Sequence, residues 1–163
     1  MEKKTNSALV AYARRALREG WVYWYGTTGR PCTESLLKRK RAQYPAHYGS
    51  ARTAAYRRHI AEKRYCADCI NLVKGYMWLD EATGKQGYAI NGCPDTNADG
   101  MFARAAQKGS IETMPDVPGL IVRFSGHGRT GTRCQACLTA RRRRRRKACW
   151  GAAYCGVAVG ARM

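Results

Sequence analysis

Cys69 and His127 are the two residues of this chain whose types and placement best suit a chemical reaction. A thiol becomes a nucleophile when its thiolate is stabilised, and the first turn of a helix offers unpaired N–H groups and a positive dipole end. Cys69 falls on such a turn in the secondary structure that the sequence predicts. The thiol also needs an imidazole, held on another element, that accepts its proton. His47 and His59 fall in a basic helical region, so His127 is the expected partner.

Two local patterns place these residues on their elements. Apolar residues recur at helical spacing between positions 72 and 77, and Asp68 is a residue type that caps a helix N-terminus. A helix is therefore predicted to begin at Cys69. Residues 118–124 are β-branched and aromatic and are bounded by turn residues, which predicts a strand that leads into His127.

Helical patterns also occur earlier in the chain. Residues 7–19 carry apolar side chains four positions apart, the last of them Leu17, and predict an amphipathic helix that ends near a glycine. Residues 34–65 are rich in Lys, Arg and Ala and are interrupted only at Pro45 and Gly49. They predict two helices whose basic face is solvated.

The segments that connect these helices have different compositions. Residues 21–25 are almost entirely aromatic and precede a glycine-rich turn, which predicts an extended segment whose rings belong mainly to the core. Residues 80–100 contain several glycines and scattered acids and predict a long loop. A short helix over 98–107 is expected after it.

Three ordered motifs point to a known family. They are Val22-Tyr23-Trp24-Tyr25-Gly26, Asp68-Cys69-Ile70-Asn71-Leu72 and Gly126-His127. This set resembles the aromatic, nucleophile and histidine motifs of the NlpC-type cell-wall cysteine peptidases, a papain-like family. Further likeness to its phage and prophage members lies in Thr33-Glu34-Ser35-Leu36-Leu37, Tyr44-Pro45, residues 70–78, Asp99-Gly100-Met101 and residues 113–119. The resemblance covers residues 8–127.

The resemblance implies an α+β fold with a papain-like core, in which helices pack on an antiparallel sheet. It implies a peptidoglycan hydrolase that cuts an amide bond of cell-wall stem peptides by a thiol mechanism, without metal or cofactor. Cys69 would be the nucleophile and His127 its base, and Asp68 and Tyr23 would line the substrate site. A capping role for Asp68 and a core role for Tyr23 remain equally open.

The chain departs from the family pattern at two places. Asn71 stands where the nucleophile motif has glycine, and residues 128–163 lack the apolar pattern of the family's last strands. A third polar residue that would orient the imidazole has only Gln135 and Thr139 as candidates. We therefore expect a hydrolase domain with an incomplete sheet over 1–127, its C-terminal strands missing or altered. An Arg- and Cys-rich tail without regular structure, of the kind that a frameshifted gene end produces, would follow over 128–163.

The net charge of +19 is distributed unevenly, since residues 1–127 hold 20 Lys and Arg against 11 acids while residues 128–163 hold 10 and no acid. Such a surface attracts polyanions, including nucleic acid and the acidic polymers of a bacterial wall. The basic start of the chain leads into no apolar stretch, and no run of about 18 apolar residues occurs. The sequence predicts a monomer without a membrane span, made in the cytoplasm without a signal peptide. It would act on peptidoglycan after phage-type release or as a virion component.

A second hypothesis is a zinc-stabilised nucleic-acid-binding protein. Cys66 and Cys69 form one pair with zinc-knuckle spacing, Cys134 and Cys137 form another, and the run Arg141–Arg146 would contact phosphates. This hypothesis requires 64 residues between the pairs and consumes the expected nucleophile. The hydrolase is therefore favoured, and nucleic-acid binding through the tail is not.

Overall fold

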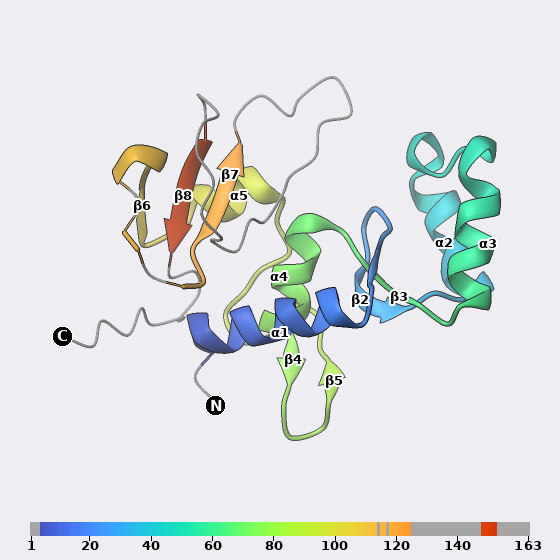
Figure 1. Cartoon of the computed structure of the whole chain (residues 1–163), viewed down its shortest axis with the longest axis horizontal. Coiled ribbons are helices and arrows are strands. Elements are labelled where there is room, and N and C mark those ends of the chain that lie inside the picture. The colour runs from blue at the N-terminus through green and yellow to red at the C-terminus, as the bar shows by residue number, and fades with distance from the viewer. Residues whose placement is uncertain (1–3, 114, 117, 125–147, 153–163) are drawn as a thin grey trace.

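The structure is a computed structural model, and it describes residues 4–113, 115–116, 118–124 and 148–152. It combines helices with small sheets, so the predicted α+β class is confirmed at this level. Helices α1 (Asn6–Arg18) and α4 (Cys69–Met77) lie in the middle of the molecule (Figure 1). Helices α2 (Glu34–Gln43) and α3 (Thr53–Ala61) lie at one end. The three-stranded sheet formed by residues 107–110, 121–124 and 148–152 lies at the other end.

Helix α1 occupies the predicted segment, and its buried face departs from the predicted one at its C-terminal end. Thr5 caps it by accepting a hydrogen bond from the Ala8 N–H, and its buried residues are Leu9, Tyr12, Ala13 and Ala16. Leu17 is 81% exposed, so its predicted place in the apolar stripe is wrong. A spacing of four advances about 40° beyond a full turn, so Leu17 is rotated by about 80° from Leu9.

Helix α4 packs against α1 in the main hydrophobic core. The Tyr76 hydroxyl accepts a hydrogen bond of 2.9 Å from the Thr5 N–H and so ties the C-terminal half of α4 to the start of α1. The buried core residues of this cluster are Leu9, Tyr12, Val73, Tyr76, Met77, Trp78, Cys93 and Met101. The helix predicted from the 72–77 pattern is therefore present, and it begins at Cys69 as expected.

A second core cluster joins α2 and α3 to a small sheet. Strand β3 (Tyr65–Ala67) pairs in parallel with β1 (Val22–Tyr23) and antiparallel with β2 (Thr28–Pro31). The cluster consists of Trp24, Cys32, Leu36, Leu37, Tyr48, Tyr56 and Cys66. The two basic helices predicted from residues 34–65 are thus confirmed, and each also carries buried apolar side chains that surround Trp24.

Trp24 is completely buried at the centre of this second cluster. Its indole N–H donates a hydrogen bond of 3.1 Å to Nδ1 of His59. Burial, reinforced by Arg58, lowers the pKa of His59 and so favours the neutral imidazole that this hydrogen bond requires. His59 is therefore a structural histidine. Short 3-10 helices, Pro45–His47 and Ser50–Arg52, connect α2 to α3.

The loop predicted over residues 80–100 contains a little regular structure. Strand β4 (Leu79–Asp80) pairs antiparallel with β5 (Lys85–Gln86), and the two form a hairpin that protrudes from the molecule (Figure 1). Helix α5 (Ala98–Ala103) follows and is capped by Asn97. It is shorter than the predicted helix over 98–107.

The third sheet has the order β6-β8-β7. Strand β7 (Ile121–Phe124) confirms the strand predicted to lead toward His127, and β6 (Gln107–Ser110) precedes it, with a 3-10 helix at Ile111–Thr113 between them. Strand β8 (Ala148–Ala152) pairs antiparallel with both. The expectation of a tail without regular structure is therefore wrong for these five residues. A short, mostly apolar run suits a central strand without any alternation of polar and apolar residues.

The remainder of the tail, including the residues of the proposed zinc and arginine sites, lies outside the described residues. Within the described ranges, no helix has the length and apolar composition that a bilayer crossing requires.

Replacing Gly75 with alanine tests the packing of α4. A Cβ at this position would lie 2.5 Å from the Thr28 carbonyl oxygen and 3.0 Å from the Tyr12 hydroxyl. Alanine favours a helix by about 1 kcal/mol, but overpacking a core costs about 1–3 kcal/mol. We expect G75A to lower the free energy of unfolding by about 1–2 kcal/mol in urea denaturation.

Gly49→Ala is the matched control, since a Cβ there meets nothing within 4 Å. It should leave the unfolding free energy within about 0.5 kcal/mol of the original value. Equal stability of the two variants would contradict the described contact between α4 and β2.

Candidate functional site

Cys69 is the first residue of α4 and is partly exposed. Cys32, Cys66 and Cys93, the other cysteines whose side chains are described, are buried, and no disulfide joins any two of these four. Cys69 therefore combines the helix-start position that stabilises a thiolate with access from solvent.

Asp68 holds the start of α4 in place. Its carboxylate accepts hydrogen bonds from the Asn71 N–H (2.7 Å), the Asn71 side-chain amide (2.6 Å) and the Gly26 N–H (2.8 Å). The residue is only 6% exposed. Burial raises the pKa of Asp68, and the hydrogen bonds from Asn71 and Gly26 oppose that shift. The capping role that the sequence left open is therefore present, and the substrate-binding role stays a prediction.

Tyr23 lies on β1 directly opposite Ala67 of β3, the residue that precedes Asp68. Its exposed fraction is 57%, so the core role that the sequence left open is wrong. The parallel pairing of β1 with β3 brings Tyr23 to the corner at which β3 passes into α4. Tyr23 thus lies on the strand beside the residue that precedes Asp68 and Cys69, and their shared role at a substrate site stays a prediction.

His127 lies outside the described residues, so its position relative to Cys69 stays a prediction. The described strand nearest to it in sequence is β7, which ends at Phe124. Ile121, at the start of β7, packs against the core cluster that contains Val73 and Tyr76 of α4. The strand that leads toward His127 therefore starts against the same core as the helix that carries Cys69.

Cys66 is oriented into the second core cluster. It is completely buried, and its thiol donates a hydrogen bond of 3.4 Å to the Arg30 carbonyl. A hydrogen bond to Cys66, together with burial, raises the pKa of the neighbouring Cys32 thiol. Within the part of the chain that the structure describes, no group of three or more His, Cys, Asp or Glu residues is placed to hold a metal ion.

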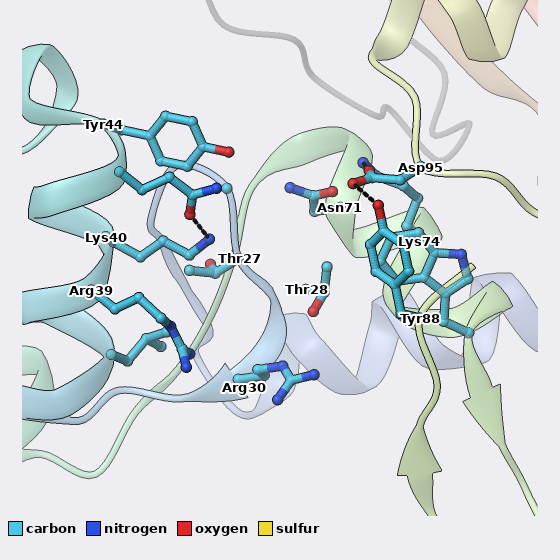
Figure 2. Close-up of a pocket in the computed structure, with 14 residues that line it drawn as sticks. Thr27, Thr28, Arg30, Arg39, Lys40, Tyr44, Asn71, Lys74, Tyr88 and Asp95 are labelled. Atoms are coloured by element: carbon cyan, nitrogen blue, oxygen red, sulfur yellow. Dashed lines mark hydrogen bonds and ion pairs between the residues drawn. The ribbon is translucent and has the colours of Figure 1, made fainter. Parts of the chain in front are cut away.

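A pocket of about 350 Å³ lies between α2 and α4 (Figure 2). Its lining residues are Gly26, Thr27, Thr28, Arg30, Leu36, Arg39, Lys40, Gln43, Tyr44, Asn71, Lys74, Trp78, Tyr88 and Asp95. Successive helical residues are rotated by about 100°, so Asn71 and Lys74 lie within about 40° of the direction opposite Cys69. The pocket and Cys69 therefore occupy opposite faces of α4.

Sequence reasoning missed this pocket. The basic residues of α2 predict a solvated surface, and nothing in the sequence indicates that residues of separate motifs line one pocket. Those residues are Gly26, Leu36, Tyr44, Asn71, Lys74 and Trp78. Gly26, with a φ of +73°, lets the chain turn beneath the Tyr44 ring, where a Cβ would come within 2.6 Å of that ring. The glycine-rich turn after the aromatic segment therefore indicates close packing around Gly26, but the sequence does not indicate that Tyr44 packs against it.

Comparison with known proteins gave no match to a family model, a curated protein or a solved structure.

Alkylation tests the exposure of Cys69. Brief treatment of the native protein with iodoacetamide should modify Cys69 faster than Cys32, Cys66 and Cys93 by at least about tenfold, because burial excludes the reagent from the others. Peptide mass spectrometry measures the site and extent of labelling. Denatured protein is the control and should label at all four positions. Equal labelling of Cys69 and Cys66 in the native protein would contradict the described burial.

Removal of the Asp68 carboxylate tests its structural role. We expect D68A to lower the free energy of unfolding by about 2 kcal/mol or more, because the helix cap is lost and the Asn71 amide loses its buried partner. Asp116→Ala removes the same charge from an exposed position and should change the stability by less than about 0.5 kcal/mol. Urea denaturation of both variants gives the comparison, and similar losses would contradict the capping role.

Proposed function

We propose that this protein is a peptidoglycan hydrolase that cleaves an amide bond of cell-wall stem peptides with Cys69 as nucleophile and His127 as base. The proposal includes a papain-like core. The observation that carries it is the position of Cys69: it begins a capped helix and remains partly exposed, while Cys32, Cys66 and Cys93 are buried.

The helix start suits both steps of acyl transfer. The Cys69 thiolate attacks the carbonyl carbon of the scissile amide, and N–H groups of the first turn of α4 stabilise the oxyanion that forms. His127 then transfers the thiol proton to the departing amine, and water hydrolyses the thioester to release the second product. Asp68 supports this chemistry by fixing the direction of the helix start.

The substrate would approach from the corner that contains Tyr23. Its exposed phenol can donate a hydrogen bond to a bound peptide or to the oxyanion. Asp68 would meet a free amine of the stem peptide, which adds a charge-assisted bond to a carboxylate already held by N–H donors. The basic surface favours contact with the acidic polymers of a bacterial wall, which the protein would reach after phage-type release or as part of a virion.

A turbidity assay with purified Gram-positive sacculi tests the mechanism. We expect C69A and H127Q each to lower the rate of clearing by about a thousandfold or more. The two residues would act as one catalytic unit, so the loss of either one removes most of the catalysis. His47→Gln changes an exposed histidine outside the proposed mechanism and should retain the rate within about twofold.

The thermal unfolding midpoint of C69A should match that of the original protein, so that a lost rate reports chemistry and not unfolding. Undiminished clearing by C69A would remove Cys69 from the mechanism. If H47Q lowered the rate of clearing as much as H127Q does, His127 would have no specific role in the mechanism.

A further inference from the structure

One wall of the pocket between α2 and α4 is formed by cations. Arg39 and Lys40 extend from α2, and Arg30 of β2 also lines the pocket (Figure 2). No carboxylate of the described residues lies within ion-pair distance of these three side chains. Lys40 instead donates a hydrogen bond of 2.9 Å to the neutral Gln43 side chain.

These positive charges are close enough to oppose one another. Burial, followed by the charge of Arg39, lowers the pKa of Lys40. The charge of Asp68 opposes this shift, Arg30 adds to it, and Asp95 opposes it more weakly. An arrangement of like charges costs free energy, and an anion placed among them recovers it. Arg30 and Arg39 are exposed and Lys40 is half-buried, so solvent and the two acids offset part of this repulsion, and an anion bound at the wall would lower what remains.

The opposite wall does not supply that partner. Asp95 is paired with Lys74 at 2.6 Å and accepts a further hydrogen bond of 3.1 Å from the Tyr88 hydroxyl. Lys74 and these hydrogen bonds lower the pKa of Asp95 despite its partial burial, so the carboxylate is ionised but already neutralised by Lys74. The lining as a whole keeps the positive charge of Arg30, Arg39 and Lys40.

The remaining surface of the pocket suits a small polar molecule. Thr28, Gln43 and Asn71 offer hydrogen-bonding groups between the two walls, and Tyr44 and Trp78 offer aromatic surface. The volume of about 350 Å³ lies at the lower end of the range for small-molecule sites. Guanidinium groups bind carboxylates and phosphates through paired hydrogen bonds, which fits the two arginines to either anion.

We propose that this pocket binds the carboxylate or phosphate group of a small anionic ligand through Arg30, Arg39 and Lys40. The site is separate from the proposed hydrolase chemistry, because Cys69 lies on the opposite face of α4. Binding of the anion therefore does not depend on the thiol.

Calorimetric titration of the full chain at constant ionic strength tests the proposal with two probes, inorganic phosphate and glutarate. We expect saturable binding of at least one probe to the original protein and to C69A, with stoichiometry near one. The double variant R39Q/K40Q should raise the dissociation constant by at least about tenfold, because it removes two of the three positive charges. The stronger of the two probes identifies phosphate or carboxylate as the preferred anion.

The control variant K38Q/R57Q removes the same charge from exposed positions that do not line the pocket. It should keep the dissociation constant within about twofold, which separates a defined site from general attraction to a basic protein. Absence of saturable binding of both probes, or equal weakening in the two double variants, would overturn the proposal.

An NMR titration of the original protein keeps the test valid if R39Q/K40Q fails to fold. Asn71 and Gln43 line the pocket, so the NMR signals of their side-chain amides should shift when the probe binds. The side-chain amide signal of Asn97, the cap of α5, should not shift. Equal shifts at all three amides would also overturn the proposal.

Discussion

The buried carboxylate of Asp68 is the interaction on which the central part of the structure depends. It joins the end of β3 to the turn at Gly26 and to the first turn of α4 through N–H donors. The backbone adds to this link, because the Asp68 N–H donates to the Thr27 carbonyl at 3.0 Å. A buried carboxylate is costly unless its hydrogen bonds are complete, so the three segments are constrained to one arrangement.

In that arrangement, one face of α4 carries the partly exposed Cys69 and the opposite face lines the pocket. Cys69 lies on one face with access to solvent, while Asn71 and Lys74 on the other face line the cationic pocket. The rest of the helix is fixed by the core cluster through Val73, Tyr76 and Met77. Because one rigid helix carries both faces, the position of the thiol and the shape of the pocket are set by the same packing.

The sequence predicted those features that local patterns determine. A capping residue followed by apolar residues at helical spacing is enough to predict a helix that begins at Cys69, and β-branched residues bounded by turns are enough for β7. The pocket could not be predicted, because its lining comes from β2, α2, α4 and the segment around Asp95, which only tertiary packing brings together. Strand β8 was missed for a similar reason, since its place is defined by pairing with β6 and β7 and not by its own alternation.

Asn71 connects the buried carboxylate of Asp68 with the pocket. Its side-chain amide donates to Asp68 at 2.6 Å, and the same residue lines the pocket opposite Cys69. A glycine at this position would provide neither the additional donor to the buried carboxylate nor a hydrogen-bonding group in the pocket. The larger residue is accommodated because it lies on the side of α4 that faces the pocket, where there is space for a side chain. Asn71 therefore contributes both to the start of α4 and to the lining of the pocket.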